Sequence, residues 1–201
     1  MLSQLDNIIF PDRCEVLEVA PQRFVYPIYK NGYSSLRESN FRTLAMTELP
    51  ALDTVEIFVR EPTERFVSGL STWIEHNSHL DRETLLFMAT NHLFINRHIA
   101  PQFHWLVNLR RCTNAQIKIN TIKDLKTITN LHVNTNEDKV HCDITHFPKI
   151  AFYMQLDKVL TETFLGQTVK FPEIVQAVKD LYPEAYKEVI QRSISLCNVL
   201  V

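Results

Sequence analysis

Three short apolar stretches, at least one of them followed by a clear helical pattern, restrict the fold of this chain more than any other feature. Residues 24–29 and 53–59 are rich in aromatic and β-branched side chains, which favour strands buried on both faces, and 115–120 is a third candidate. Apolar residues at helical spacing follow the second stretch over 63–76. Repeated strand–turn–helix order predicts an α/β fold in which helices flank a central parallel sheet.

The other segments favour one domain over residues 1–201 with a helical C-terminal part over 148–201. Residues 14–20 alternate in part and predict an edge strand, whereas 96–104 breaks the helical pattern and predicts a loop. Helices are predicted over 34–44, 82–95, 122–131, 148–164, 171–181 and 183–196, with a surface loop over 132–146.

The turn after the first buried strand has the composition of an anion-binding loop. Lys30 supplies a mobile positive charge, and Gly32, one of only three glycines in the chain, allows a tight turn. A strand, a tight turn and the start of a helix direct backbone N–H groups toward one point. The candidate phosphate-binding residues here are Lys30, Asn31, Gly32, Tyr33, Ser34 and Ser35.

A second group with phosphate-binding character follows the next buried strand. Arg60 stands at the strand exit, Pro62 suits the first turn of a helix, and Ser68 lies on its second turn. An arginine fork binds phosphate through paired N–H donors, and a serine hydroxyl adds another bond. Because the carboxyl ends of parallel strands share one edge, the nucleotide-binding motifs within 24–70 suit a ligand with two separate phosphates.

These motifs resemble those of a known enzyme family. Tyr-Lys-Asn-Gly-Tyr-Ser-Ser-Leu at 29–36 looks like the 5′-phosphosulfate loop of sulfotransferases that use 3′-phosphoadenosine-5′-phosphosulfate (PAPS). Arg-Glu-Pro-x-x-Arg-Phe-Val-Ser-Gly at 60–69 looks like their 3′-phosphate motif, and His-x-x-Pro-Gln at 98–102 is closest to the Golgi-type carbohydrate sulfotransferases. The family often has proline directly before the lysine and aspartate after the arginine, where this chain has Tyr29 and Glu61.

The resemblance implies a P-loop-like three-layer domain that transfers a sulfuryl group from PAPS to a hydroxyl acceptor and releases 3′-phosphoadenosine-5′-phosphate (PAP). Lys30 would neutralise the bridging oxygen of the leaving phosphate, while Arg60 and Ser68 would bind the 3′-phosphate. PAPS is the expected co-substrate, and the scheme requires no metal. The expected acceptor is a hydroxylated small molecule or a glycan, with a carbohydrate as the leading candidate.

A base must accept the proton of the acceptor hydroxyl, and histidine suits this role near neutral pH. His98 leads because it lies in the irregular segment and matches the His-x-x-Pro pattern of the resembling family. Arg65 is expected to brace the loop through a carboxylate such as Glu61. The other candidates for the base are Glu38, Glu48, His76 and His104.

Composition restricts the partners and the compartment. The net charge of −2 argues against nucleic-acid binding, and no apolar run approaches the ~20 residues that span a bilayer. The lack of a recognisable signal peptide and the four scattered cysteines predict a cytoplasmic protein with reduced thiols. The triplet His141, Cys142 and His146 could hold a metal, but without a second cluster it favours a surface loop.

Two other functions are compatible with the same motifs. A small P-loop kinase fits less well, because glycine follows the lysine instead of preceding it. A non-catalytic protein that binds a nucleotide or a partner could use the same fold, with Lys30 as a solvated lysine and Arg60 as part of an ordinary helix start. Three aromatic residues could stack on adenine or a sugar, or else belong to the core: Trp73, Trp105 and Phe103.

Overall fold

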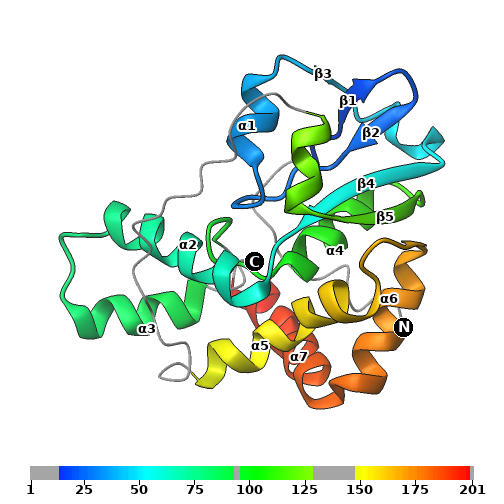
Figure 1. Cartoon of the computed structure of the whole chain (residues 1–201). Coiled ribbons are helices and arrows are strands. Elements are labelled where there is room, and N and C mark those ends of the chain that lie inside the picture. Colours follow the sequence, from blue (N-terminus) through cyan, green and yellow to red (C-terminus); the bar gives the residue numbers. More distant parts are fainter. Residues whose placement is uncertain (1–13, 93–95, 129–147, 200–201) are drawn as a thin grey trace.

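The computed structural model describes residues 14–92, 96–128 and 148–199, and in this part of the chain a mixed six-stranded sheet has helices on both faces (Figure 1). The strand order across the sheet is β3-β1-β2-β4-β5-β6. The strands are β1 (Leu17–Ala20), β2 (Arg23–Val25), β3 (Arg42–Thr43), β4 (Thr54–Val59), β5 (Gln116–Thr121) and β6 (Thr168–Val169).

The predicted parallel sheet is correct for the centre and wrong for the flanks. β2, β4 and β5 run parallel, with Val25 opposite Glu56 and Glu56 opposite Lys118. β1, β3 and β6 are antiparallel to their neighbours. The β1–β2 pair is antiparallel because the tight turn at 21–22 reverses the chain without a crossover. β1 is also not the expected edge strand, since β3 pairs with its outer side.

Helices make up most of the rest of the described chain. Two segments are 3-10 helices: η2 (Leu49–Ala51) precedes β4, and η3 (Ile122–Thr127) follows β5. A π-helical turn, η5 (Val159–Thr163), continues the α-helix α5 (Pro148–Lys158). The α-helices are α1 (Tyr33–Glu38), α2 (Pro62–His76), α3 (Arg82–His92), α4 (Gln102–Cys112), α5 (Pro148–Lys158), α6 (Phe171–Leu181) and α7 (Pro183–Val199).

Two predicted helices are shorter than expected. The helix over 34–44 ends at Glu38, because Asn40 takes a left-handed φ of 53° and β3 follows. The helix over 122–131 is a 3-10 segment in its described part and ends at Thr127. The predicted loop over 132–146 lies outside the described residues.

The predicted loop over 96–104 is wrong at its end, because α4 begins at Gln102. Pro101 precedes the first helical residue, and no side chain of the helix itself caps it. Asp157 of α5 supplies the cap, accepting the backbone N–H groups of Gln102 at 2.7 Å and Phe103 at 2.8 Å. The helix start is therefore stabilised from 55 residues away, which local sequence patterns do not reveal.

The two faces of the sheet pack differently. Val55 and Ile57 of β4 belong to a large core that α2, α4, α5, α6 and α7 share. Phe58 points the opposite way and joins a smaller core with Leu36 of α1 and Leu125 of η3. This alternation follows from the two-residue period of a strand. Helices on both sides therefore form three layers, and β2 and β4 end at the same edge because they are parallel.

Two findings bear on the environment of the protein. Within the described part of the chain, none of the helices combines the length and the apolar character that crossing a bilayer requires. Cys14 and Cys112 are free thiols, and burial raises the pKa of the Cys14 thiol, with Cys112 as its hydrogen-bonding neighbour. Cys142 and the side chain of Cys197 lie outside the described residues.

Candidate functional site

The Lys30 loop leaves the carboxyl end of β2 through two left-handed residues. Lys30 has a φ of 67° and Gly32 a φ of 79°. Glycine tolerates this conformation, and a Cβ at Gly32 would also overlap the side chain of Leu125. Lysine does not favour it, and residues strained in this way persist only where their surroundings hold them, often at functional sites.

The Lys30 side chain reaches across to α2. Its Nζ donates a hydrogen bond to Thr72 Oγ1 at 2.5 Å. Burial lowers the pKa of Lys30. The Glu75 carboxylate opposes this effect, whereas the positive charges of Arg65 and Arg60 add to it. Two arginines and the Glu75 carboxylate thus act on the ammonium group, and the excess of positive charge among these side chains favours a bound anion.

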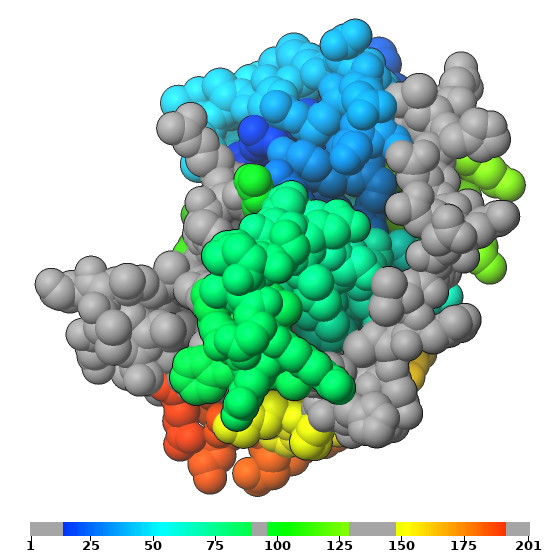
Figure 2. All heavy atoms as spheres, turned by 90° about the vertical axis from the view of Figure 1, so that its left-hand side faces the viewer, coloured from blue at the N-terminus to red at the C-terminus, as the bar shows by residue number. Residues whose placement is uncertain are grey.

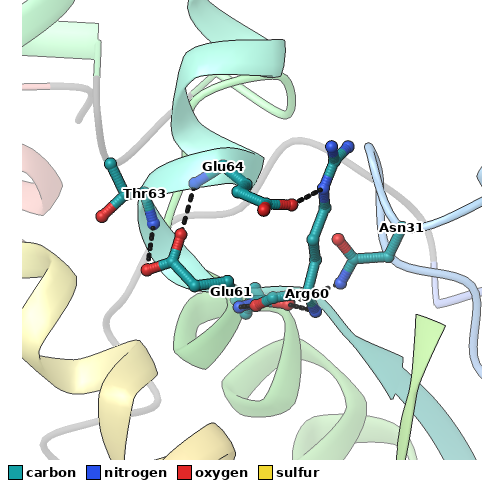
Figure 3. Close-up of polar contacts among 6 residues, drawn as sticks. Asn31, Arg60, Glu61, Thr63 and Glu64 are labelled. Carbon is teal, nitrogen blue, oxygen red and sulfur yellow. Dashed lines mark hydrogen bonds and ion pairs between the residues drawn. The ribbon is translucent and has the colours of Figure 1, made fainter. Parts of the chain in front are cut away.

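Arg60 follows β4 directly and lies at the same edge. Its Nε donates to the Glu64 carboxylate at 3.1 Å, and its side chain is 13% exposed. Glu61 accepts the backbone N–H groups of Thr63 and Glu64 and thereby caps α2. In Figure 3 the two terminal amino groups of Arg60 extend beyond these contacts, so they are placed to meet an anion.

The remaining residues of the Lys30 loop differ in burial. Asn31 is buried and lies beside Arg60 (Figure 3). Its Nδ2 donates to the carbonyl oxygen of Phe58 at 2.8 Å. Ser34 is exposed, whereas Ser35 is buried. Of the two serines, Ser34 is therefore the one whose hydroxyl is open to a ligand.

The α2 face next to the loop carries the second predicted phosphate residue. Arg65 donates to the loop from this face, and Lys30 binds Thr72 two turns further along. Ser68 is half-buried and stands between these two contacts at helical spacing, so it shares their face. Figure 2 shows the blue segment that carries α1 bordering the teal and green α2 and α3 on one side of the molecule.

Arg65 braces the loop, but not through Glu61 as predicted. It is fully buried, and its guanidinium donates to the carbonyl oxygens of Tyr29 at 3.2 Å and Ala100 at 2.5 Å. Burial lowers its pKa to about 10, and the nearby Asp157 carboxylate opposes this effect. Arg65 therefore joins the Lys30 loop to the segment that follows His98, and Glu61 is used in the cap of α2 instead.

His98 is brought to the Lys30 region by a close backbone contact. A Cβ at Gly69 of α2 would overlap the carbonyl oxygen of His98, so a glycine is required for this approach. The His98 ring packs edge-on against His76, with 5.4 Å between ring centroids, and against Tyr29 at 5.5 Å. The structure thus places two of the candidate bases, His98 and His76, side by side.

The chemistry of His98 suits a neutral imidazole. Burial lowers its pKa to about 4, and the positive charges of Lys30 and Arg97 add to this effect. Its Nδ1 is buried and has no hydrogen-bond partner among the described residues. A neutral histidine beside Lys30 is able to accept a proton at physiological pH.

The other candidate bases are less favourably placed. His104 is fully buried, and burial lowers its pKa to about 3, so it cannot contact an acceptor and its candidacy is withdrawn. Glu48 is bound to Arg42 of β3 at 2.8 Å, which lowers its pKa. Glu38 is exposed at the end of α1. His98 and His76 therefore remain the candidates with contacts in the Lys30 region.

The predicted aromatic platforms belong to the core. Trp73, Trp105 and Phe103 are at most 2% exposed, so none of them can stack on adenine or a sugar. Trp105 instead stacks beneath Tyr29 with 5.3 Å between ring centroids, and Tyr33 packs on Tyr29 at 4.0 Å. These ring contacts pack Tyr29, at the start of the Lys30 loop, against the core.

Three residues to which sequence reasoning gave no role hold the site together. Thr72 receives the Lys30 ammonium, Asp157 caps α4, and Gln102 contacts both phosphate motifs. The spacing of Thr72 from Ser68, four residues on one helix face, was a usable signal. Gln102 ends the His-x-x-Pro-Gln pattern, but nothing local indicates what it or Asp157 contacts, because their partners lie between 42 and 71 residues away.

Metal ligands were also sought. In the described ranges, no group of three or more His, Cys, Asp or Glu side chains is arranged to hold a metal ion. The triplet of His141, Cys142 and His146 lies outside the described residues.

Comparisons with protein-family models, with curated proteins and with solved structures found no match for this chain.

Proposed function

We propose that this chain is a sulfotransferase that moves a sulfuryl group from PAPS to a hydroxyl of an acceptor, with a carbohydrate as the leading acceptor class, and releases PAP. The observation that carries the proposal is the position of Lys30. It is left-handed and half-buried, it is bonded to α2, and Arg60 and Arg65 lie close enough to lower its pKa. Three cations at the carboxyl edge of a central parallel sheet suit an anionic ligand.

The distribution of the groups supports a ligand with two phosphates. Lys30 and the exposed Ser34 follow β2, whereas Arg60 and the half-buried Ser68 follow β4. Two neighbouring parallel strands therefore each contribute a cation and a hydroxyl at one edge. PAPS carries a 5′-phosphosulfate and a separate 3′-phosphate, which matches two such groups.

The proposed reaction is an in-line displacement at sulfur. The bond between sulfur and the bridging oxygen of PAPS breaks, and a bond from the acceptor oxygen to sulfur forms. Lys30 stabilises the negative charge that develops on the bridging oxygen, as cations do in phosphoryl transfer. The hydroxyl proton passes to His98, and PAP leaves with the electron pair of the broken bond.

Ligand binding tests this proposal directly. PAP at 100-fold its Kd should stabilise the protein by about 2.7 kcal/mol, which raises the Tm by roughly 5–10 °C. Differential scanning fluorimetry with PAP, ATP and ADP, each with and without Mg²⁺, measures the preference. Stabilisation by Mg·ATP but not by PAP would reject the sulfotransferase and favour a kinase. Transfer of labelled sulfate from PAPS to a panel of glycans then separates an enzyme from a non-catalytic binding protein.

The pH profile tests His98 as the base. Because its pKa is lowered to about 4, the imidazole is neutral and active above that value and protonated and inactive below it. We expect kcat/KM to stay level from pH 6 to pH 5 and to fall as the pH drops through about 4. His98→Ala should lower kcat by about 10²- to 10⁴-fold.

His79→Ala is the matched control, because His79 is an exposed histidine beyond the end of α2. It should leave the rate and the profile unchanged. Near-normal turnover in His98→Ala would move the role of base to His76, Glu38 or Glu48, and His76→Ala is the next variant to measure.

A further inference from the structure

The side chain of Gln102 connects the two proposed phosphate-binding groups. Gln102 is fully buried at the first residue of α4. Its Oε1 accepts the backbone N–H of Arg60 at 3.0 Å and the Nδ2–H of Asn31 at 2.5 Å, while its Nε2 donates to the Arg60 carbonyl oxygen at 3.0 Å. One carboxamide thus contacts Asn31, which follows Lys30, and Arg60, which follows β4.

The Gln102 side chain pairs with the backbone of Arg60 in the way that a neighbouring strand would. The parallel β4–β5 ladder ends where Val59 lies opposite Thr121. Arg60 is the next residue, and its N–H and C=O are both paired with the Gln102 carboxamide. Gln102 therefore replaces the strand neighbour that Arg60 lacks and orients the backbone from which the Arg60 guanidinium extends.

The contact with Asn31 holds the strained loop. Asn31 is 1% exposed and lies between Lys30 and Gly32, which are both left-handed. Its Nδ2 donates to the Phe58 carbonyl oxygen as well as to Gln102. A strained lysine keeps its conformation only if such contacts determine it. These two bonds therefore fix the backbone position from which the Lys30 side chain extends.

Gln102 is itself held in place from a third element. Its backbone N–H donates to the Asp157 carboxylate at 2.7 Å, and Asp157 is fully buried in α5. The carboxamide is therefore a fixed point between the loop after β2 and the end of β4. Figure 3 shows how close the two sides are, since Asn31 and Arg60 lie next to each other.

We propose that Gln102 is a positioning residue that sets the separation of the Lys30 loop and Arg60, so that both phosphates of one 3′,5′-bisphosphorylated nucleoside bind at once. This inference rests on the proposed function. Two groups that engage one ligand strengthen its binding only if their spacing matches the ligand. The Gln102 carboxamide touches no phosphate in this scheme, so its loss acts through Lys30 and Arg60.

The test compares one bisphosphate with its two monophosphates. Isothermal titration calorimetry gives Kd for PAP, 5′-AMP and 3′-AMP with the wild type and with Gln102→Met, which keeps the volume of the side chain and removes its hydrogen bonds. We expect PAP to bind about 10- to 100-fold more weakly to the variant, because two linked phosphates gain about 10²- to 10⁴-fold in affinity when both are engaged, and a changed spacing loses part of that gain. Each monophosphate needs only one group and should change by less than about threefold.

Asn108→Leu is the control on the same helix. Asn108 is a buried amide, six residues after Gln102, that donates to Tyr26 Oη at 3.0 Å. It should destabilise the fold without altering the ratio of PAP affinity to monophosphate affinity. Gln102→Asn serves if Gln102→Met does not fold, because it keeps an uncharged carboxamide but shortens the side chain by one methylene, away from Arg60 and Asn31, and it should lower the same ratio.

The outcomes separate the two proposals. An unchanged affinity ratio in a folded Gln102 variant, with a wild type that prefers PAP, would show that Gln102 is only structural and would leave the proposed function standing. A wild type that binds PAP no more tightly than 5′-AMP would reject both. A lowered ratio in Gln102→Met but also in Asn108→Leu would reject the positioning role, because general destabilisation would then explain it.

Discussion

Replacing Lys30 with alanine is expected to lower the kcat of sulfuryl transfer by about 10²- to 10³-fold, the usual effect of removing one group that stabilises developing charge. The ammonium group is aimed by the left-handed backbone at Lys30 and by its bond to Thr72. Alanine removes the charge and leaves Arg60 and Arg65 in place, so PAP should still bind. The measurement is the initial rate of labelled-sulfate transfer, with Kd for PAP determined in parallel.

Two further variants separate the effect on chemistry from the effect on binding. Arg60→Ala should chiefly weaken binding of PAPS, because Arg60 is proposed to hold the 3′-phosphate, away from the transferred group. Lys123→Ala removes an exposed lysine of η3 and should leave both quantities unchanged. Full activity in both Lys30→Ala and Arg60→Ala would overturn the assignment of the site.

Asp157→Ala is expected to lower the free energy of unfolding by about 3–5 kcal/mol, because it leaves two buried N–H groups without an acceptor and removes a carboxylate whose charge acts on the buried Arg65. Arg65 is fully buried, and Asp157 is the carboxylate that opposes the lowering of its pKa. The same substitution removes the acceptor for two N–H groups at the start of α4. In a chain of 201 residues this corresponds to a Tm lower by roughly 6–20 °C.

Thermal or urea unfolding measures this change, and Asp180→Ala provides the control. Asp180 is an exposed residue of α6 that accepts one hydrogen bond from Gln176, so its removal should have little effect. The double variant Arg65→Met with Asp157→Ala should recover part of the loss, because the buried guanidinium, whose charge Asp157 offsets, is then removed as well. A Tm for Asp157→Ala within 2 °C of the wild type would show that Asp157 does not stabilise the fold.

The local patterns of the chain were sufficient to predict the elements that carry the proposed site. Apolar and β-branched residues predicted β4 and β5 to within about a residue, and Pro62 with Glu61 before it marked the start of α2. Lys30, Gly32 and Arg60 were selected by their place after a strand. Arg60 does follow β4 directly, but the strand predicted over 24–29 was wrong at its end, because β2 ends at Val25 and Lys30 comes five residues later. Short-range sterics and hydrophobic periodicity decide such features, and both are visible in the sequence.

Long-range contacts decided what the sequence patterns missed. The antiparallel flanks of the sheet depend on which strand edges meet, and α4 begins at Gln102 because Asp157, 55 residues later, accepts its N–H. Burial also excludes His104 as the base, because it lowers the pKa of the imidazole and keeps the acceptor from reaching it. Burial of this kind is a property of the tertiary structure.

The amino-acid sequence by itself determined that two neighbouring strands end in cationic, hydroxyl-bearing turns. Only the tertiary structure decided that Lys30 reaches Thr72, that Arg65 ties Tyr29 to Ala100, and that a single carboxamide at Gln102 joins both turns. The physical reason is that these bonds join residues 35 to 71 positions apart. They depend on the packing of the sheet with α2, α4 and α5, and they hold Lys30 in a left-handed conformation that lysine does not favour.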